Sequence, residues 1–241
     1  LFMNEHKKEY SFTEQKVRWV KKHTPKLLSF SITRPKDFDF IAGQFAKLGF
    51  MQGDEYISRA YSMISAENTD HLDFYAILIE DGIMSGHFNQ MQAGDSLLLE
   101  KKPIGFFTVS RIPQGEEIVL LATGSGIAPF LSMLENETLW QKADKVVLVH
   151  SVSYVDDLVF EQYLADLKDH AIVGKYANKF IYQPVITREK IAGALNQRIP
   201  QLLENSELEN ALNITFTKAD TRFLICGNPN MVKESYEKLK A

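Results

Sequence analysis

The segment that most constrains the fold is an apolar stretch at residues 118–122 that leads through Gly124-Ser125-Gly126 into an amphipathic stretch. A parallel strand that feeds a helix through glycines lets the backbone approach a ligand, and free N–H groups at the helix start attract anions. Pro129 suits a first helical turn, where its missing N–H costs little. Pro129 also replaces the third glycine of the usual dinucleotide-binding fingerprint. By itself the turn is therefore either a phosphate site or a tight bend.

Strands and helices alternate through the second half of the chain. We expect strands at 118–122, 145–150, 179–186 and 222–226, and helices at 128–139, 157–169, roughly 189–204 and 229–240. Alternation of this kind predicts an α/β domain with a parallel sheet covered on both faces.

The first half of the chain has a different pattern, in which short strands are separated by glycine turns. Residues 27–32, 72–79 and 96–100 are typical of strands, and residues 85–91 offer a short helix. Strands and turns at this spacing predict a small antiparallel β-barrel. The pattern changes near residues 112–117, so we expect two domains, over residues 1–112 and 113–241.

The composition is that of a soluble globular protein, with 45% apolar and 24% charged residues. No apolar run approaches the ~20 residues of a membrane span, and no apolar region follows a basic start as in a secretory signal. Cys226 is the only cysteine, which excludes an intrachain disulfide and a four-thiolate iron–sulfur centre and fits a reducing compartment. We expect a cytoplasmic protein with no metal site, no membrane span, and no nucleic acid among its partners.

Charge is distributed unevenly along the chain. Residues 1–35 contain eight basic side chains and three glutamates, a balance of +5, whereas the whole chain carries −4. The basic residues are Lys7, Lys8, Lys16, Arg18, Lys21, Lys22, Lys26 and Arg34. This basic segment is either a solvated face or a docking surface for an acidic partner.

Two short motifs in the first half could bind a nucleotide. In Arg59-Ala60-Tyr61-Ser62, a guanidinium could clamp a phosphate, a tyrosine could lie against a flat ring, and a hydroxyl could bond to a ring nitrogen. At Gly82 to Ser85, a glycine turn opens a short helix whose N–H groups could hold a diphosphate. Taken singly, the first motif could be an ordinary strand and the second a capped turn.

Two further motifs lie in the second half. Thr187-Arg188 follows an apolar strand and Arg198 lies ten residues beyond, so the two arginines could grip the 2′-phosphate of NADP or merely lie on the surface. In Cys226-Gly227-Asn228-Pro229, a cysteine ends a predicted parallel strand, where ligands of open α/β sheets bind. A lone cysteine there could equally be part of the core.

Together, the motifs resemble the ferredoxin–NADP reductase family, and above all its bacterial ferredoxin/flavodoxin–NADP reductases. The resemblance rests on four motifs in order, Arg59-x-Tyr61-Ser62, the Gly82 turn with Ser85, Thr123-Gly124-x-Gly126, and Cys226-Gly227-x-Pro229-x-Met231, and it covers roughly residues 10–240. It implies an N-terminal flavin-binding barrel, a C-terminal domain for the nicotinamide nucleotide, and FAD and NADP as cofactors.

The resemblance also implies a role for each matching residue. Arg59 would meet the FAD diphosphate, Tyr61 would stack on the flavin ring, and Ser62 would lie near flavin N5. Ala60 would also bind the cofactor. The flavin site would be completed by Tyr75, Ala76, Ile77, Ile83, Met84 and Ser85, with Thr123 at the domain junction. NADP would follow Gly124, Gly126, Cys226, Gly227, Asn228, Pro229 and Met231, and its 2′-phosphate would meet Thr187, Arg188 and Arg198. Ser62 and Cys226 are the candidates beside the reacting atoms.

The sequence departs from the family pattern at two places. Related bacterial sequences usually have an arginine where this chain has Ser153, so one expected contact to the 2′-phosphate is absent. Family members also continue beyond the last helix into a tail that packs near the flavin, whereas this sequence stops at Ala241. We expect either a tail that this sequence lacks or an unusually open flavin face.

The resemblance implies an enzyme that passes electrons between NADP(H) and ferredoxin or flavodoxin. Hydride transfer at flavin N5 would be followed by one-electron steps, and no general base is required. The alternatives are a soluble NAD(P)H–flavin or quinone reductase and a non-catalytic electron-transfer subunit. A subunit of that kind usually needs an iron–sulfur ligand set, which one cysteine cannot supply.

Overall fold

Six antiparallel strands make up the first half of the chain, in a computed structural model that describes residues 11–240. They are β1 (Phe12–Thr24), β2 (Leu27–Thr33), β3 (Phe45–Gln52), β4 (Glu55–Ser62), β5 (His71–Ile77) and β6 (Ser96–Glu100), in the order β4-β3-β6-β1-β2-β5. A bridge between Met63, just after β4, and Phe74 in β5 joins the two edge strands. The sheet therefore closes into the predicted antiparallel barrel. Lys7 and Lys8 of the basic segment lie outside the described residues.

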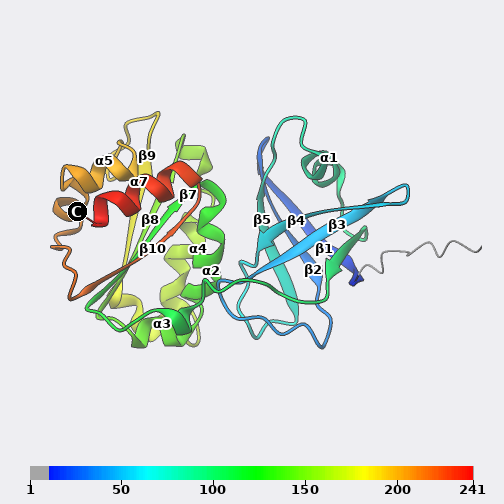
Figure 1. The fold of residues 1–241 in the computed structure, drawn as a ribbon, viewed down its shortest axis with the longest axis horizontal. Coiled ribbons are helices and arrows are strands. Elements are labelled where there is room, and N and C mark those ends of the chain that lie inside the picture. Colours follow the sequence, from blue (N-terminus) through cyan, green and yellow to red (C-terminus); the bar gives the residue numbers. More distant parts are fainter. Residues whose placement is uncertain (1–10, 241) are drawn as a thin grey trace, which may run out of the picture.

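Apolar side chains fill the barrel because they recur at every second position of its strands. Leu28 and Phe30 of β2 and Phe74 of β5 are fully buried, and the Phe30 and Phe74 rings stack with their centroids 5.4 Å apart. Helix α1 (Ile83–Gln90) lies at one end of the barrel (Figure 1), where the Phe88 ring packs 4.9 Å from that of Phe30. This packing fixes α1 relative to β2 and β5.

Four parallel strands form the second sheet, as the alternating pattern predicted. They are β7 (Glu117–Thr123), β8 (Lys145–Val152), β9 (Phe180–Ile186) and β10 (Thr221–Cys226), in the order β10-β7-β8-β9. The helices are α2 (Ala128–Leu134), α3 (Glu137–Gln141), α4 (Glu161–Asp166), α5 (Ile199–Glu204), α6 (Glu207–Leu212) and α7 (Pro229–Lys240).

Helices cover both faces of this sheet, which explains why its central strands are continuous apolar runs. In β7, Leu120 packs with side chains of α2 to α4, whereas Leu121 packs with those of α5 to α7. The sheet and its helices lie beside the barrel (Figure 1). No helix within residues 11–240 is both long enough and apolar enough to cross a membrane.

The helix expected at residues 189–204 was wrong over most of its length. The backbone of Leu195 bonds to Pro184 and Ile186, so this segment runs along the free edge of β9. Gly193 adopts a φ of +83°, which a helix does not allow, and α5 begins only at Ile199. Elsewhere, Asn136 splits the helix expected at 128–139 because it caps α3, and α6 was not predicted.

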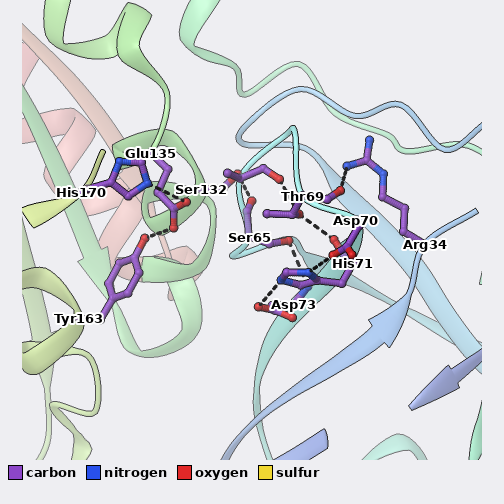
Figure 2. A network of polar contacts seen from close by, with 11 residues as sticks. Arg34, Ser65, Thr69, Asp70, His71, Asp73, Ser132, Glu135, Tyr163 and His170 are labelled. Carbon is purple, nitrogen blue, oxygen red and sulfur yellow. Dashed lines mark hydrogen bonds and ion pairs between the residues drawn. The ribbon is translucent and has the colours of Figure 1, made fainter. Parts of the chain in front are cut away.

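Polar contacts join the barrel to the parallel-sheet half (Figure 2). The Ser132 hydroxyl on α2 donates to the Ser65 carbonyl oxygen over 2.7 Å. The Glu67 carboxylate accepts from the Ala42 N–H at 2.7 Å and from the Asn136 side chain at 2.8 Å. These contacts tie the loop after β4 to α2 and α3, and they therefore hold the two sheets in one orientation.

Candidate functional site

A cavity of about 750 Å³ lies where the barrel meets the carboxyl ends of β7 and β10. The barrel contributes Arg59, Ala60, Tyr61, Ser62, Tyr75, Ala76, Ile77, Ile79, Gly82, Ile83, Met84 and Ser85. The parallel-sheet half contributes Thr123, Gly124, Ser125, Gly126, Ala128, Pro129, Cys226, Gly227 and Asn228. Two motifs from each half of the chain thus share one cavity, at the edge of the sheet where α/β folds bind ligands.

The end of β4 presents Arg59 and Tyr61 to this cavity. Arg59 is exposed, and its Nη1 donates to the Ser58 carbonyl oxygen at 2.7 Å. Within residues 11–240 its guanidinium forms no ion pair, so it is free to meet an anion. Tyr61 packs edge-on against Phe88 of α1, 5.2 Å between centroids, and burial raises the pKa of its hydroxyl to about 12. Tyr61 therefore offers a neutral ring held in a fixed orientation.

The start of α1 supplies a hydroxyl and free backbone N–H groups. Ser85 Oγ accepts from the Ile79 N–H at 2.8 Å, which folds the side chain back over the turn that Gly82 closes. A serine hydroxyl that accepts in this way retains its own proton for donation. The arrangement can hold an oxyanion at the mouth of the helix, as the sequence predicted for a diphosphate.

The glycines of the two strand–helix turns are needed because the turns pack on one another. A Cβ on Gly126 would lie 2.3 Å from the Cys226 carbonyl oxygen, and a Cβ on Gly227 would lie 2.1 Å from Thr123 Oγ1. The Thr123 hydroxyl accepts from the Asn228 N–H at 2.8 Å across the same contact. This mutual packing brings the carboxyl ends of β7 and β10 together at the cavity.

Beneath the first of these turns lies His150, which belongs to none of the predicted motifs. It is 1% exposed in β8, and its Nε2 donates to the Gly124 carbonyl oxygen at 3.0 Å. Burial lowers the pKa of this imidazole from 6.5 to about 4, so it is neutral at physiological pH. The only signal in the sequence was a histidine at the end of an apolar strand.

Cys226 and Ser62 both line the cavity, one from each half of the chain. Both are partly buried. Burial raises the pKa of the Cys226 thiol, so the sulfur stays protonated at neutral pH. A neutral thiol and a hydroxyl can donate hydrogen bonds here without adding charge.

A second groove, of about 600 Å³, continues from this cavity and shares Ile77, Thr123, Gly124 and Asn228 with it. Its other lining residues are Lys26, Leu27, Ser151, Val152, Ser153, Asp157, Thr187, Arg188, Arg198, Ile199, Asn230 and Met231. The structure therefore brings Thr187, Arg188 and Arg198 together, along with Ser153. Lys26 and Asp157 were not expected here, because they belong to no motif and come from distant parts of the chain.

The two arginines of the second groove already have partners. Arg188 Nη1 donates to the Tyr154 hydroxyl at 3.3 Å, and its guanidinium lies 5.8 Å above the Tyr154 ring. Arg198 forms an ion pair with Glu234 at 3.3 Å, with both side chains about half exposed. Exposed pairs of this kind are weak, so both guanidinium groups can turn to a phosphate.

Of the predicted site residues in the described part of the chain, one does not line the site, and it is Pro229. It is the first residue of α7 and lines neither the cavity nor the groove within the described part of the chain. All the other predicted residues line one or both.

Comparisons with known proteins point to one family. Residues 17–108 match the model of the oxidoreductase FAD-binding domain, and residues 120–236 match that of the oxidoreductase NAD-binding domain. The chain is 37% identical over 221 residues to a flavodoxin/ferredoxin–NADP reductase of Buchnera aphidicola, covering 91% of this chain and 86% of that one. It is 34% identical to the flavodoxin/ferredoxin–NADP reductase of Escherichia coli, with the same coverage.

A solved structure agrees with these matches. A ferredoxin NADP+ reductase from Neisseria gonorrhoeae, with bound FAD and NADP, superposes with a TM-score of 0.90 at 48% identity. The match covers 96% of this chain and 92% of that one.

Proposed function

Because the chain belongs to the flavodoxin/ferredoxin–NADP reductase family, we propose that it is a FAD-dependent oxidoreductase that passes electrons between NADP(H) and ferredoxin or flavodoxin. The observation that carries this proposal is the continuous space formed by the cavity and the second groove. It leads from Arg59 and α1 at one end to Arg188 and Arg198 at the other. Two nucleotides can therefore enter from opposite ends and meet at Thr123 and Cys226.

The residues present fit FAD in the cavity. The guanidinium of Arg59 and the hydroxyl of Ser85 are available for a diphosphate, and the Tyr61 ring is held by Phe88. A volume of about 750 Å³ lies within the range of sites for large ligands. When bound, the flavin would supply the chemistry of accepting a hydride and releasing electrons singly.

The chain's own part in the reaction is to position the reactants rather than to transfer protons. Tyr61 and Tyr75 are held neutral because burial raises the pKa of each hydroxyl. The neutral groups of Ser62 and Cys226 are the candidates that border the reacting atoms. The contact between Thr123 and Asn228 holds β7 and β10 together, which keeps the two nucleotide paths at a constant separation. Such preorganisation is a large part of the rate gain in reactions between two bound molecules.

The groove fits NADP at its adenosine end. Arg188 and Arg198 would meet the 2′-phosphate, because their present partners are exposed and easily exchanged. Ser153 lines the same groove without charge, which removes one contact expected in the family. Because both arginines are present, we still expect NADPH to be preferred over NADH.

We further propose that the boundary between the flavin and nucleotide domains lies at residues 112–113, and that the protein acts in the cytoplasm. The first proposal is supported by the two family models, which leave residues 109–119 unmatched between them. The second is supported by a single cysteine, which suits a reducing compartment.

The electron carrier would dock on the basic segment, since ferredoxins and flavodoxins are acidic and the flavin edge must be approached closely. Arg34 takes no part in this dock, because it donates to the carbonyl oxygens of Phe38, Glu67 and Thr69 inside the barrel domain. Lys16 is partly neutralised by Glu14, 3.4 Å away. Lys26 lines the nucleotide groove, so the other basic side chains of the segment would supply a transient attraction.

The test is a visible spectrum of the purified protein followed by steady-state rates with NADPH. Bound flavin gives a yellow protein, and reduction of ferredoxin or flavodoxin faster than of free flavin or a quinone supports the proposal. A colourless protein that binds no FAD would refute it. Preference for free flavin or a quinone would instead identify an NAD(P)H–flavin or quinone reductase.

A further inference from the structure

The barrel side of the second groove carries a lysine to which no motif assigns a role. Lys26 occupies the short turn between β1 and β2, is exposed, and lines the groove beside Leu27. Arg188 and Arg198 line the same groove from the other half of the chain. Lys26 is therefore a cation that the barrel domain presents to the nucleotide path.

The backbone of this turn is hydrogen-bonded on both sides of the Lys26 Cα, which anchors the side chain. Its N–H donates to Thr24 Oγ1 at 3.2 Å, and its carbonyl oxygen accepts from the Leu78 N–H at 2.7 Å. The next residue, Leu27, is 5% exposed and pairs with Ile77 in β5. Because the lysine side chain is flexible and its backbone is hydrogen-bonded in place, the ammonium group can reach a phosphate over a short range of positions.

The anchor lies close to the turn after β7. The Ile77 side chain reaches to within 3.1 Å of the point where a Cβ on Gly124 would lie. Lys26, hydrogen-bonded to the residue after Ile77, thus lies with Thr123 and Gly124 where the groove joins the cavity. A dinucleotide with its 2′-phosphate at Arg188 and Arg198 and its reactive end in the cavity would pass its diphosphate along this part of the groove.

The charges around this point leave a place for a cation. Within residues 11–240, the Lys26 ammonium forms no ion pair and no hydrogen bond. The Asp157 carboxylate lines the same groove, while Ser153 contributes no charge. The negative charge of a dinucleotide diphosphate in this groove would be repelled by the Asp157 carboxylate. The turn at Gly124 offers only backbone dipoles to offset that repulsion.

We propose that Lys26 binds the diphosphate of the nicotinamide dinucleotide from the barrel side of the groove. The inference rests on the proposed function, since it assigns Lys26 to the NADP(H) path. The two arginines then recognise the 2′-phosphate, and Lys26 recognises the group that NADPH and NADH share. Lys26 strengthens the binding of both dinucleotides without discriminating between them.

The experiment compares Lys26→Met with Lys36→Met in the full flavin-loaded protein. Lys36 is an exposed lysine of the same domain that lines neither the cavity nor the groove, so its variant removes the same charge. The dissociation constant of NADP+ is measured by calorimetry, and kcat and KM are measured for NADPH and for NADH. Flavin spectrum and thermal midpoint establish that both variants fold.

For Lys26→Met we expect the NADP+ dissociation constant to rise roughly three- to tenfold, the range of a charge-assisted contact partly screened by solvent. The KM for NADPH and the KM for NADH should rise by the same factor, and Lys26→Arg should restore most of the affinity. Lys36→Met should bind as the parent does.

Two results would overturn the inference. Unchanged affinity in Lys26→Met would show that the ammonium does not reach the dinucleotide. A loss confined to NADPH would mean that Lys26 meets the 2′-phosphate and not the diphosphate. A parent protein that fails to oxidise NADPH would instead refute the proposed function, so the two failures are distinguishable.

Discussion

The burial of His150 makes a quantitative prediction about stability and pH. The imidazole is 1% exposed, its one recorded polar contact within the described residues is with the Gly124 carbonyl oxygen, and its pKa is lowered from 6.5 to about 4. In the unfolded chain the same side chain is hydrated and keeps its ordinary pKa. Between about pH 6.5 and about pH 4 the unfolded state therefore binds more protons than the folded state.

The sign and size of the effect follow from this difference. The free energy of unfolding is undiminished by His150 above the unfolded pKa of 6.5. It falls as the pH drops through the window toward about 4, because the unfolded state takes up the proton first. At about 1.4 kcal/mol per pH unit, the full loss is about 3 kcal/mol. At about pH 5, within the window, the loss relative to about pH 7 is about 2 kcal/mol.

The assay is urea unfolding, followed by far-UV circular dichroism, at about pH 7 and about pH 5 and constant ionic strength. The parent is compared with His150→Gln, whose amide can donate to Gly124 but cannot titrate. Burial also lowers the pKa values of His23 and His87, but these histidines are present in both proteins and their effects cancel. The parent should lose about 2 kcal/mol more than the variant. Equal losses would show that His150 is hydrated or charged, and the reasoning would fail.

Three further predictions concern the nucleotides and the electron carrier. Arg59→Ala should lose a contact of roughly 1.5–3 kcal/mol to the FAD diphosphate; flavin content after gel filtration measures this, and retention equal to the parent would disprove the assigned flavin site. Replacing Arg188 and Arg198 by Ala should raise the KM for NADPH with little change for NADH, because the 2′-phosphate is remote from the chemistry; equal use of both dinucleotides by the parent would contradict this assignment. Raising salt at saturating NADPH should slow electron transfer to ferredoxin but not to a neutral quinone, because exposed charges are screened over about 8 Å at physiological ionic strength; an identical salt dependence for both acceptors would mean that the basic segment is only a solvated face. The basic residues concerned are Lys7, Lys8, Lys16, Arg18, Lys21 and Lys22, because Lys26 of the same segment is assigned to the dinucleotide.

The pattern of apolar residues predicted the elements that fill the two cores. The strand expected at 118–122 appears as β7, buried on both faces, and the alternation in β2 places Leu28 and Phe30 inside the barrel. Such predictions succeed because burial imposes a pattern on the sequence. Apolar residues alternate with polar ones along a half-buried strand and form a continuous run along a central strand. The motifs at Arg59 and Gly82 could also be identified from the sequence, because each lies within a few residues of the turn that presents it.

The segment before α5 shows where the pattern of apolar residues fails to predict the structure. Its composition favours a helix, but the backbone of Leu195 finds its partners on the edge of β9, and those hydrogen bonds depend on a strand already in place. Tertiary contacts also decide whether a charged side chain is available to bind a ligand. Arg34 and Arg59 look alike in the sequence, yet Arg34 is bound by three carbonyl oxygens while Arg59 forms no ion pair in the described chain.

The sequence by itself determined the two sheet types, the glycine turns and the local motifs, because each depends on residues close together in the chain. Only the tertiary structure decided which side chains share the nucleotide path. Lys26, Asp157 and Arg198 meet across one groove although more than a hundred residues separate the first from the second. His150 became a buried neutral base only when the turn after β7 folded over it. Burial and through-space charge are properties of position, and the local pattern of residues does not contain them.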